Sequence, residues 1–133
     1  MRKTSVEVEF VISGDDFEID EITKKLNIRP SKFWKLKEDV KGTFKREKCT
    51  MWLYSTGKNE TLDIYTELKK IQDIFAPKVD VLCKIKEKYK LDYCLDIVII
   101  IENGETPAIY LENSIINFIS KIGGIIDMDT YVN

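Results

Sequence analysis

Histidine is missing from this 133-residue sequence altogether. Its absence excludes the Ser-His-Asp and Cys-His arrangements that activate a nucleophile, and it removes the commonest protein ligand of transition metals. General acid–base chemistry would have to use carboxylates, lysine or tyrosine with shifted pKa values. The sequence therefore predicts a chain that is not an enzyme and that has no metal site and no cofactor.

Cysteine is scarce and its spacing does not suggest pairing. Cys49, Cys83 and Cys94 form an odd set without a Cys-x-x-Cys motif, unlike a disulfide framework or a zinc site. Free cysteine is among the most buried residue types, so we interpret the three residues as small buried or half-buried thiols.

Long apolar runs are also absent. No stretch approaches the roughly 20 residues that span a bilayer, and Met1-Arg2-Lys3-Thr4 leads directly into alternating Val and Glu instead of a signal peptide. The net charge of −2 and the pI near 5.3 argue against a protein that coats nucleic acid with its whole surface. We expect a cytoplasmic protein that does not bind a membrane.

What is present is the composition of a globular protein. The content of 44% hydrophobic and 33% charged residues allows a real core and a highly charged surface. The length is that of one domain, so we expect a single domain over residues 1–133.

Alternation and helical periodicity place the secondary structure. Period-two patterns predict strands at residues 5–13, 33–37, 50–55, 91–101, 108–111 and 125–132. Helical spacing of apolar residues predicts helices at residues 16–26, 60–75, 78–89 and 114–122. This order predicts an α+β fold with an antiparallel or mixed β-sheet and about three to four helices packed mainly on one face.

Two details of this pattern carry further expectations. The centre of one strand, residues 97–101, is apolar at every position, which predicts that both of its faces are covered. Residues of similar type recur at the same spacing in two places, starting at Phe17 and at Tyr110, each time between a strand and a helix. It leaves open a duplicated strand–helix unit, although amphipathic helices also produce this spacing independently.

An acidic loop, Gly14-Asp15-Asp16, stands between the first strand and the first helix. Adjacent carboxylates there could hold Mg²⁺ or Ca²⁺, and a His-free enzyme would have to use such groups. Asp and Gly are also what a strand-to-helix turn requires, because a carboxylate caps the free N–H groups of the helix. We interpret Asp15 and Asp16 as capping residues, and Asp127 and Asp129 as the solvated face of the last strand.

The most unusual segment is basic. Residues 24–48 contain ten Lys or Arg against three acids, a net of +7, so that the rest of the chain carries −9. Aromatic residues are interleaved with these charges, as in surfaces that bind nucleic acid or another polyanion. The alternative is an ordinary Lys-rich surface on a loop and an edge strand. The candidate binding residues are Arg29, Lys32, Phe33, Trp34, Lys35 and Lys37. Of the two tryptophans, we expect Trp52 in the core and Trp34 at the surface.

The first third of the chain resembles a known family. Phe10-x-Ile12-x-Gly14-Asp15-Asp16-Phe17 leads to Asp20-Glu21-Ile22-Thr23, and then to Leu26-x-Ile28-x-Pro30-Ser31 with Trp34. This combination is similar to a family of small bacterial proteins known as a domain of unknown function. The similarity continues through Trp52 to the closing pattern Gly123-x-x-x-Asp127-x-Asp129-x-Tyr131. The resemblance implies a bacterial origin and a single domain, and it supplies no activity.

Three functional hypotheses follow from these features. The first is a non-enzymatic module that binds another protein, as an immunity or accessory factor does, because charge segregation favours fast and specific association. The second is binding of nucleic acid or another polyanion through residues 24–48. The third is a His-free, carboxylate- or Mg²⁺-dependent enzyme. The oligomeric state stays open.

Overall fold

A computed structural model describes residues 2–36 and 49–133 of the chain. Its elements are β1 (Ser5–Gly14), α1 (Ile19–Leu26), β2 (Lys32–Trp34), β3 (Thr50–Ser55), β4 (Asn59–Glu60), α2 (Ile64–Phe75), the 3₁₀ turn η1 (Ala76–Lys78), α3 (Val79–Tyr89), β5 (Asp92–Ile101), α4 (Asn113–Lys121) and β6 (Ile125–Val132). The strands form one mixed sheet in the order β2-β3-β1-β5-β6, and β4 pairs with one end of β1. The β5–β6 pair is parallel, whereas β1 pairs antiparallel with β3, β4 and β5.

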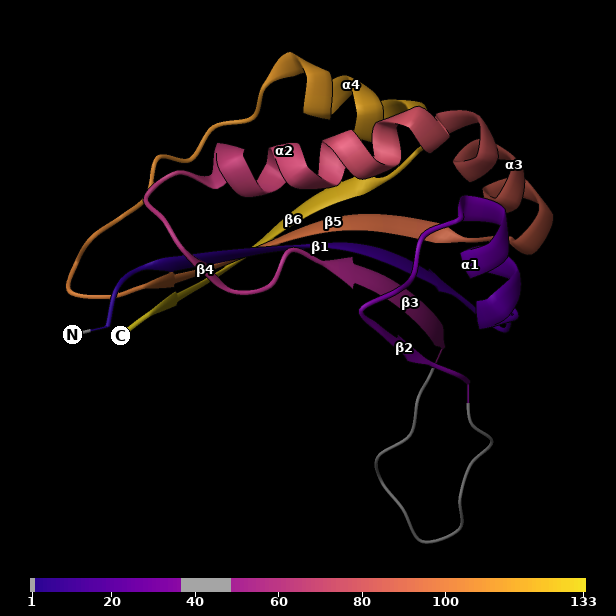
Figure 1. The fold of residues 1–133 in the computed structure, drawn as a ribbon, viewed down its shortest axis with the longest axis horizontal. Helices are drawn as coiled ribbons and strands as arrows, with labels where there is room; N and C mark the ends of the chain where they lie inside the picture. The colour runs from indigo at the N-terminus through magenta and orange to yellow at the C-terminus, as the bar shows by residue number, and fades with distance from the viewer. Residues whose placement is uncertain (1, 37–48) are drawn as a thin grey trace, which may run out of the picture.

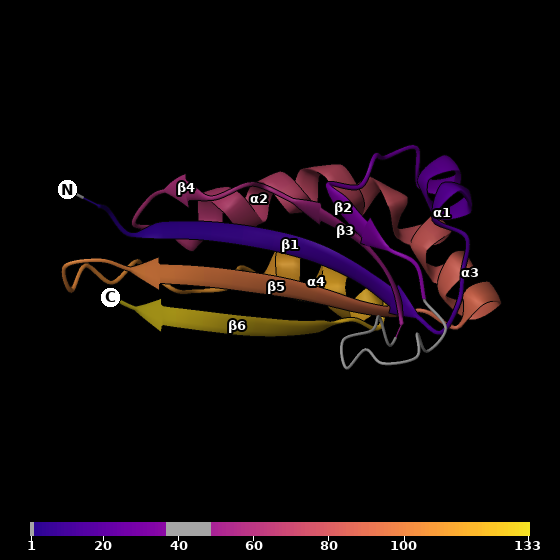
Figure 2. The same ribbon diagram turned by 90° about the horizontal axis from the view of Figure 1, so that it is seen from below.

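The helices lie together on one side of this sheet. Figure 1 shows α1, α2, α3 and α4 above the sheet, and Figure 2 shows its opposite face crossed by strands alone. In the described residues no helix covers that second face. The predicted α+β fold, with a mixed sheet and helices on one face, is confirmed.

The core forms between the helices and the inner face of the sheet. Val6, Val8, Phe10 and Ile12 of β1 are fully buried, as their alternation predicts. The ring of Phe10 stacks on that of Phe75 at the end of α2, with 4.3 Å between the centroids. Helix packing of this kind, more than intrinsic propensity, stabilises short amphipathic helices such as α2 and α4.

Trp52 belongs to this core, as expected. Its side chain has no exposed surface, and its Nε1–H donates a hydrogen bond of 3.1 Å to Thr23 Oγ1 on α1. The bond satisfies the polar end of a buried indole and joins β3 to α1.

The start of α1 differs from the expectation. Its N-cap is Glu18, which makes no side-chain capping bond, so Asp15 and Asp16 do not cap the helix. The physical reason is Phe17, which is only 3% exposed. The chain returns this ring to the core before the helix begins, and the two aspartates are left in the preceding bend.

Helix α2 has an N-cap of the usual kind, an aspartate. Asp63 accepts a hydrogen bond of 2.8 Å from the backbone N–H of Tyr65, as an N-cap carboxylate does. Asn59, directly before the helix start that the sequence predicts, pairs instead in β4. The predicted return strand at 108–111 is reduced to a single bridge between Ala108 and Asp63.

Strand β5 is covered on one face only. Ile97, Ile99 and Ile101 point into the core, whereas Val98 and Ile100 are half-buried on the opposite face. The expectation that both faces are covered is therefore wrong for the described residues. A run of apolar residues indicates an interior strand, and β5 is one, but the second face is flanked only by side chains of β1 and β6.

The two strand–helix units are similar but not equivalent. Strand β6 returns parallel to β5 and directly beside it after α4. Strand β2 also runs parallel to β1 after α1, because each is antiparallel to β3. In the first unit β3 separates the two parallel strands, so the units differ in topology.

Candidate functional site

The second face of the sheet, which we call the open face, presents ordered rows of side chains. Strand pairing aligns Lys32, Leu53, Val11, Cys94 and Ile125 in one row from β2 to β6. Leu53, Val11, Cys94 and Ile125 form what we call the apolar row. The next row, two residues along each strand, places Glu9 beside Asp96 and Asp96 beside Asp127. The open face therefore changes from apolar to acidic over two residues along the strands.

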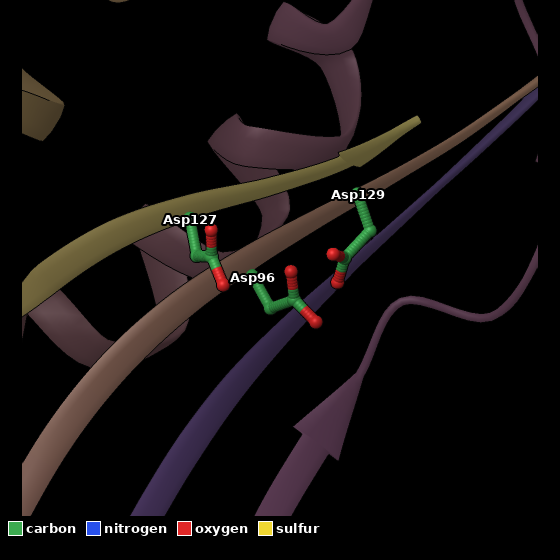
Figure 3. A group of neighbouring side chains, drawn as sticks. All are labelled: Asp96, Asp127 and Asp129. Atoms are coloured by element: carbon green, nitrogen blue, oxygen red, sulfur yellow. The ribbon is translucent and has the colours of Figure 1, made fainter. Parts of the chain in front are cut away.

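The acidic part continues over three strands, and we call it the acidic band. It consists of Glu7, Glu9, Asp96, Asp127 and Asp129. Figure 3 shows the carboxylates of Asp96, Asp127 and Asp129 pointing toward one another from β5 and β6. One oxygen of each lies within 4.8 Å of the others.

Asp96 stands at the centre of the band and has an altered acidity. Burial, hydrogen bonding with Asp129 and the negative charges of Asp129, Glu9 and Asp127 raise the pKa of Asp96 to about 7. Its Oδ1 atom is buried and accepts no hydrogen bond from the described part of the chain. The pKa of Glu9 is also raised, by burial and then by Glu7, although Lys32 opposes this rise. The band is therefore a site of crowded, incompletely compensated negative charge.

A groove lies beside the band on the same face. It has a volume of about 440 Å³, and its walls include Trp34, Met51, Leu53 and Val11 as well as Lys32, Glu9 and Asp96. The side chain of Trp34 is half-buried here, not fully exposed. An apolar floor with carboxylates along one side can hold an apolar side chain and pair a neighbouring positive charge.

Among the described residues, Asp96, Asp127 and Asp129 are the group that could hold a hard divalent cation, which takes six or more oxygen ligands. Exposed acidic groups are common without an ion, and three carboxylates do not by themselves define a metal site. A carboxyl group with a pKa near 7 can also exchange a proton at neutral pH, and burial is the main reason that the pKa of Asp96 lies there.

The basic candidates do not gather on one face. Lys32 and Trp34 lie on the open face, whereas Phe33 points to the other side and is 59% exposed. Arg29 is exposed in the loop before β2. Lys37 and the remaining basic residues of the segment 37–48 lie outside the described residues.

Lys35 joins the basic segment to the acidic loop. Its Nζ donates to Asp16 Oδ1 at 2.8 Å, to the carbonyl of Phe17 at 2.8 Å and to Glu18 Oε1 at 3.3 Å. Hydrogen bonding to Asp16 raises the pKa of Lys35. Asp16 is thus engaged in an ion pair with Lys35, and Asp15 is exposed beside it.

The acidic band as a unit is not predicted from the sequence. Asp127 and Asp129 are expected there as a solvated strand face, and Asp96 has no predicted role. A signal was present, because charged residues interrupt three strands at alternate positions: Glu7 and Glu9 in β1, Asp96 in β5, and Asp127 and Asp129 in β6. Only the order of the strands brings them together.

The fold and this face define a small α+β domain with a one-sided sheet and a charged open face. A model of the family described as domain of unknown function DUF4279 matches residues 3–133. The chain belongs to this family, as the sequence resemblance indicates. No curated protein and no solved structure matches it. Within the described ranges, no helix has the length and apolar character needed to cross a membrane.

Proposed function

We propose that this chain is a non-enzymatic protein-binding module, and that its open face receives a basic surface of another protein. The observation that carries the proposal is the adjacency of the apolar row and the acidic band on a face that no helix of residues 2–36 and 49–133 covers. An apolar anchor would enter the groove beside Trp34, and Lys or Arg side chains of the partner would neutralise the band.

Charge complementarity favours a basic partner for this face. Burial first, then the hydrogen bond with Asp129 and repulsion by Asp129, Glu9 and Asp127, raise the pKa of Asp96 to about 7. A partner that brings positive charge removes this repulsion, so binding and electrostatic relief are coupled. Lys32 is the described open-face residue that already lowers the pKa of Glu9 in this way.

A polyanion is a poorer match for the same face. Lys24 and Lys25 lie on α1, on the helical side of the sheet, whereas Lys32 lies on the open face. A nucleic acid that followed Lys32 would approach the acidic band, and phosphates would be repelled there. We therefore place protein binding before nucleic-acid binding and before carboxylate-dependent catalysis.

The proposal is tested by selecting ligands for the full chain from a random library of 12-residue peptides displayed on phage. We expect the selected peptides to be rich in Lys or Arg and to contain an apolar anchor. Trp34→Ala and Asp129→Lys should each weaken their binding at least tenfold, which is about 1.4 kcal/mol.

Matched controls lie on the helical side. Ile116→Ala removes an apolar side chain of α4 that is 42% exposed, and Glu87→Lys makes the same charge change on the exposed surface of α3. Both controls should leave affinity within about twofold. A result in which all four variants bind the selected peptides equally would refute binding at the open face.

A further inference from the structure

We infer that the partner binds by adding a β-strand to the free edge of β6, with basic side chains placed opposite Asp127 and Asp129. This inference rests on the proposed function, because it specifies how a basic protein reaches the open face. It begins from the sheet order, in which β6 is the last strand and pairs with β5 alone among the described strands. Figure 2 shows β6 at the margin of the sheet.

The edge of β6 is longer than the opposite edge of the sheet, and its apolar side chains are exposed. Strand β6 has eight residues, whereas β2 at the other edge has three. Ile125, Tyr131 and Val132 are 64%, 56% and 73% exposed. Long edges with exposed apolar side chains are the edges to which another strand is added.

The backbone groups that face outward can be assigned. The N–H of Asn133 donates to the carbonyl of Ile101, so this N–H points toward β5. Because successive N–H groups along a strand point to opposite sides, those of Met128, Thr130 and Val132 point away from the sheet. The N–H of Met128 agrees with this assignment, since it donates at 3.0 Å to the side chain of Asp127.

A second copy of the chain does not suit this edge. Two copies of β6 related by a twofold axis would run antiparallel. The registers that overlap most of the strand place Asp127 opposite Asp129, or Asp129 opposite itself. Like charges directly opposite each other destabilise a strand pair, so self-pairing is disfavoured while both groups are ionised.

A strand from a basic partner suits the edge of β6 instead. On the open face β6 presents Ile125, Asp127, Asp129 and Tyr131 at alternate positions. The complementary strand carries an apolar residue, two basic residues and an apolar or aromatic residue, also at alternate positions. This pattern is the same in both directions, so it applies to parallel and to antiparallel addition. A basic side chain would also draw the Asp127 carboxylate away from the N–H of Met128 and free that donor.

The test uses the peptides selected against the full chain, with Thr130→Pro as the decisive variant. Proline removes the outward N–H of residue 130 and is tolerated on an edge strand when that N–H faces away from the sheet. Thr130→Val is the matched control, because it keeps both the N–H and a β-branched side chain. We expect alternating apolar-basic-basic-apolar peptides, at least tenfold weaker binding to Thr130→Pro, and unchanged binding to Thr130→Val by fluorescence anisotropy.

Circular dichroism shows whether Thr130→Pro folds. If it does not, amide hydrogen exchange of the wild-type chain replaces it, and the N–H groups of Thr130 and Val132 should exchange more slowly with peptide bound. Peptides that lose affinity with Trp34→Ala but not with Thr130→Pro, or that protect neither amide, would overturn strand addition and leave the proposed function intact. Two outcomes would overturn both strand addition and the proposed function. In the first, the selected peptides are insensitive to every open-face variant, and in the second, the library yields no binding peptide.

Discussion

Asp96 of β5 and Asp127 of β6 are register partners in the parallel ladder, so two carboxylates stand side by side on the open face of the sheet. Glu9 flanks Asp96 on its other side, and Asp129 completes a group whose oxygens lie within 4.8 Å. This crowding is unfavourable for the chain alone, because burial and repulsion both disfavour the ionised forms. A partner that brings positive charge, as in the proposed function, would offset it.

The first prediction concerns Asp96 and pH. The raised pKa of about 7, against an ordinary value of 3.8, means that the folded chain binds more protons than the unfolded chain between about pH 4 and pH 7. The free energy of unfolding therefore falls as pH rises through this window. Asp96→Asn removes the ionisation and should stabilise the chain by about 1–2 kcal/mol at pH 8, allowing for solvent screening, and by less at pH 4.

Urea unfolding at the two pH values measures this difference. Asp92→Asn is the control, since Asp92 begins the same strand and is exposed. Its effect on stability should be small and similar at both pH values. Equal effects of Asp96→Asn at pH 4 and pH 8 would contradict the electrostatic interpretation.

The second prediction concerns self-association. If the charges of Asp127 and Asp129 keep β6 from pairing with a second copy, the double change Asp127→Thr and Asp129→Thr should promote dimers, because threonine favours strands and removes the repulsion. Sedimentation velocity at pH 7 should show a larger dimer fraction than for the wild-type chain. Adding Thr130→Pro to the double variant should reverse the effect. A dimer that persists would form through a surface other than the edge of β6.

The third prediction concerns Lys35. Its three hydrogen bonds hold the acidic loop and the N-cap of α1 against the chain directly after β2. Lys35→Met keeps most of the aliphatic stem and loses these bonds, so it should reduce the free energy of unfolding by about 0.5–1 kcal/mol. The loss should shrink in 1 M salt, because the pair with Asp16 is exposed. Thermal melts at both salt concentrations measure it.

Lys69→Met provides the comparison for Lys35. Lys69 pairs with Asp73 one turn along α2, at 2.6 Å, and this pair connects no separate elements. We expect a smaller loss of stability than for Lys35→Met. An equal or larger loss would show that the loop contacts of Lys35 add nothing to an ordinary surface pair.

The fourth prediction concerns the thiols. Burial, followed by the charges of Asp96, Asp127 and Asp129, raises the pKa of Cys94 to about 11. At pH 8 about one part in a thousand of this thiol is therefore the reactive thiolate. Cys83 is exposed on α3, and a chain with Cys49→Ser should react with a disulfide reagent first at Cys83. Peptide mapping after partial modification identifies the site, and faster reaction at Cys94 would contradict the assigned environment.

Local patterns were sufficient for most of the elements. Alternation in β1 and helical spacing in α2 predict both segments because side-chain burial in each depends on a short repeat. Capping was less predictable, since Asp15 has the spacing of a cap but the buried ring of Phe17 moves the start of α1 to Ile19. The residue that caps a helix depends on where the chain first meets the core, and that is a tertiary property.

The sequence by itself determined an α+β chain with no histidine, amphipathic helices and alternating strands, because these depend on residue type and short-range periodicity. Only the tertiary structure decided that Glu9, Asp96 and Asp127 are neighbours, since the strand order β1-β5-β6 joins positions more than 30 residues apart. It also decided that Val98 lies on the open face and that β6 is the last of the described strands in the sheet. Strand order arises from how whole elements pack, and no local pattern encodes it.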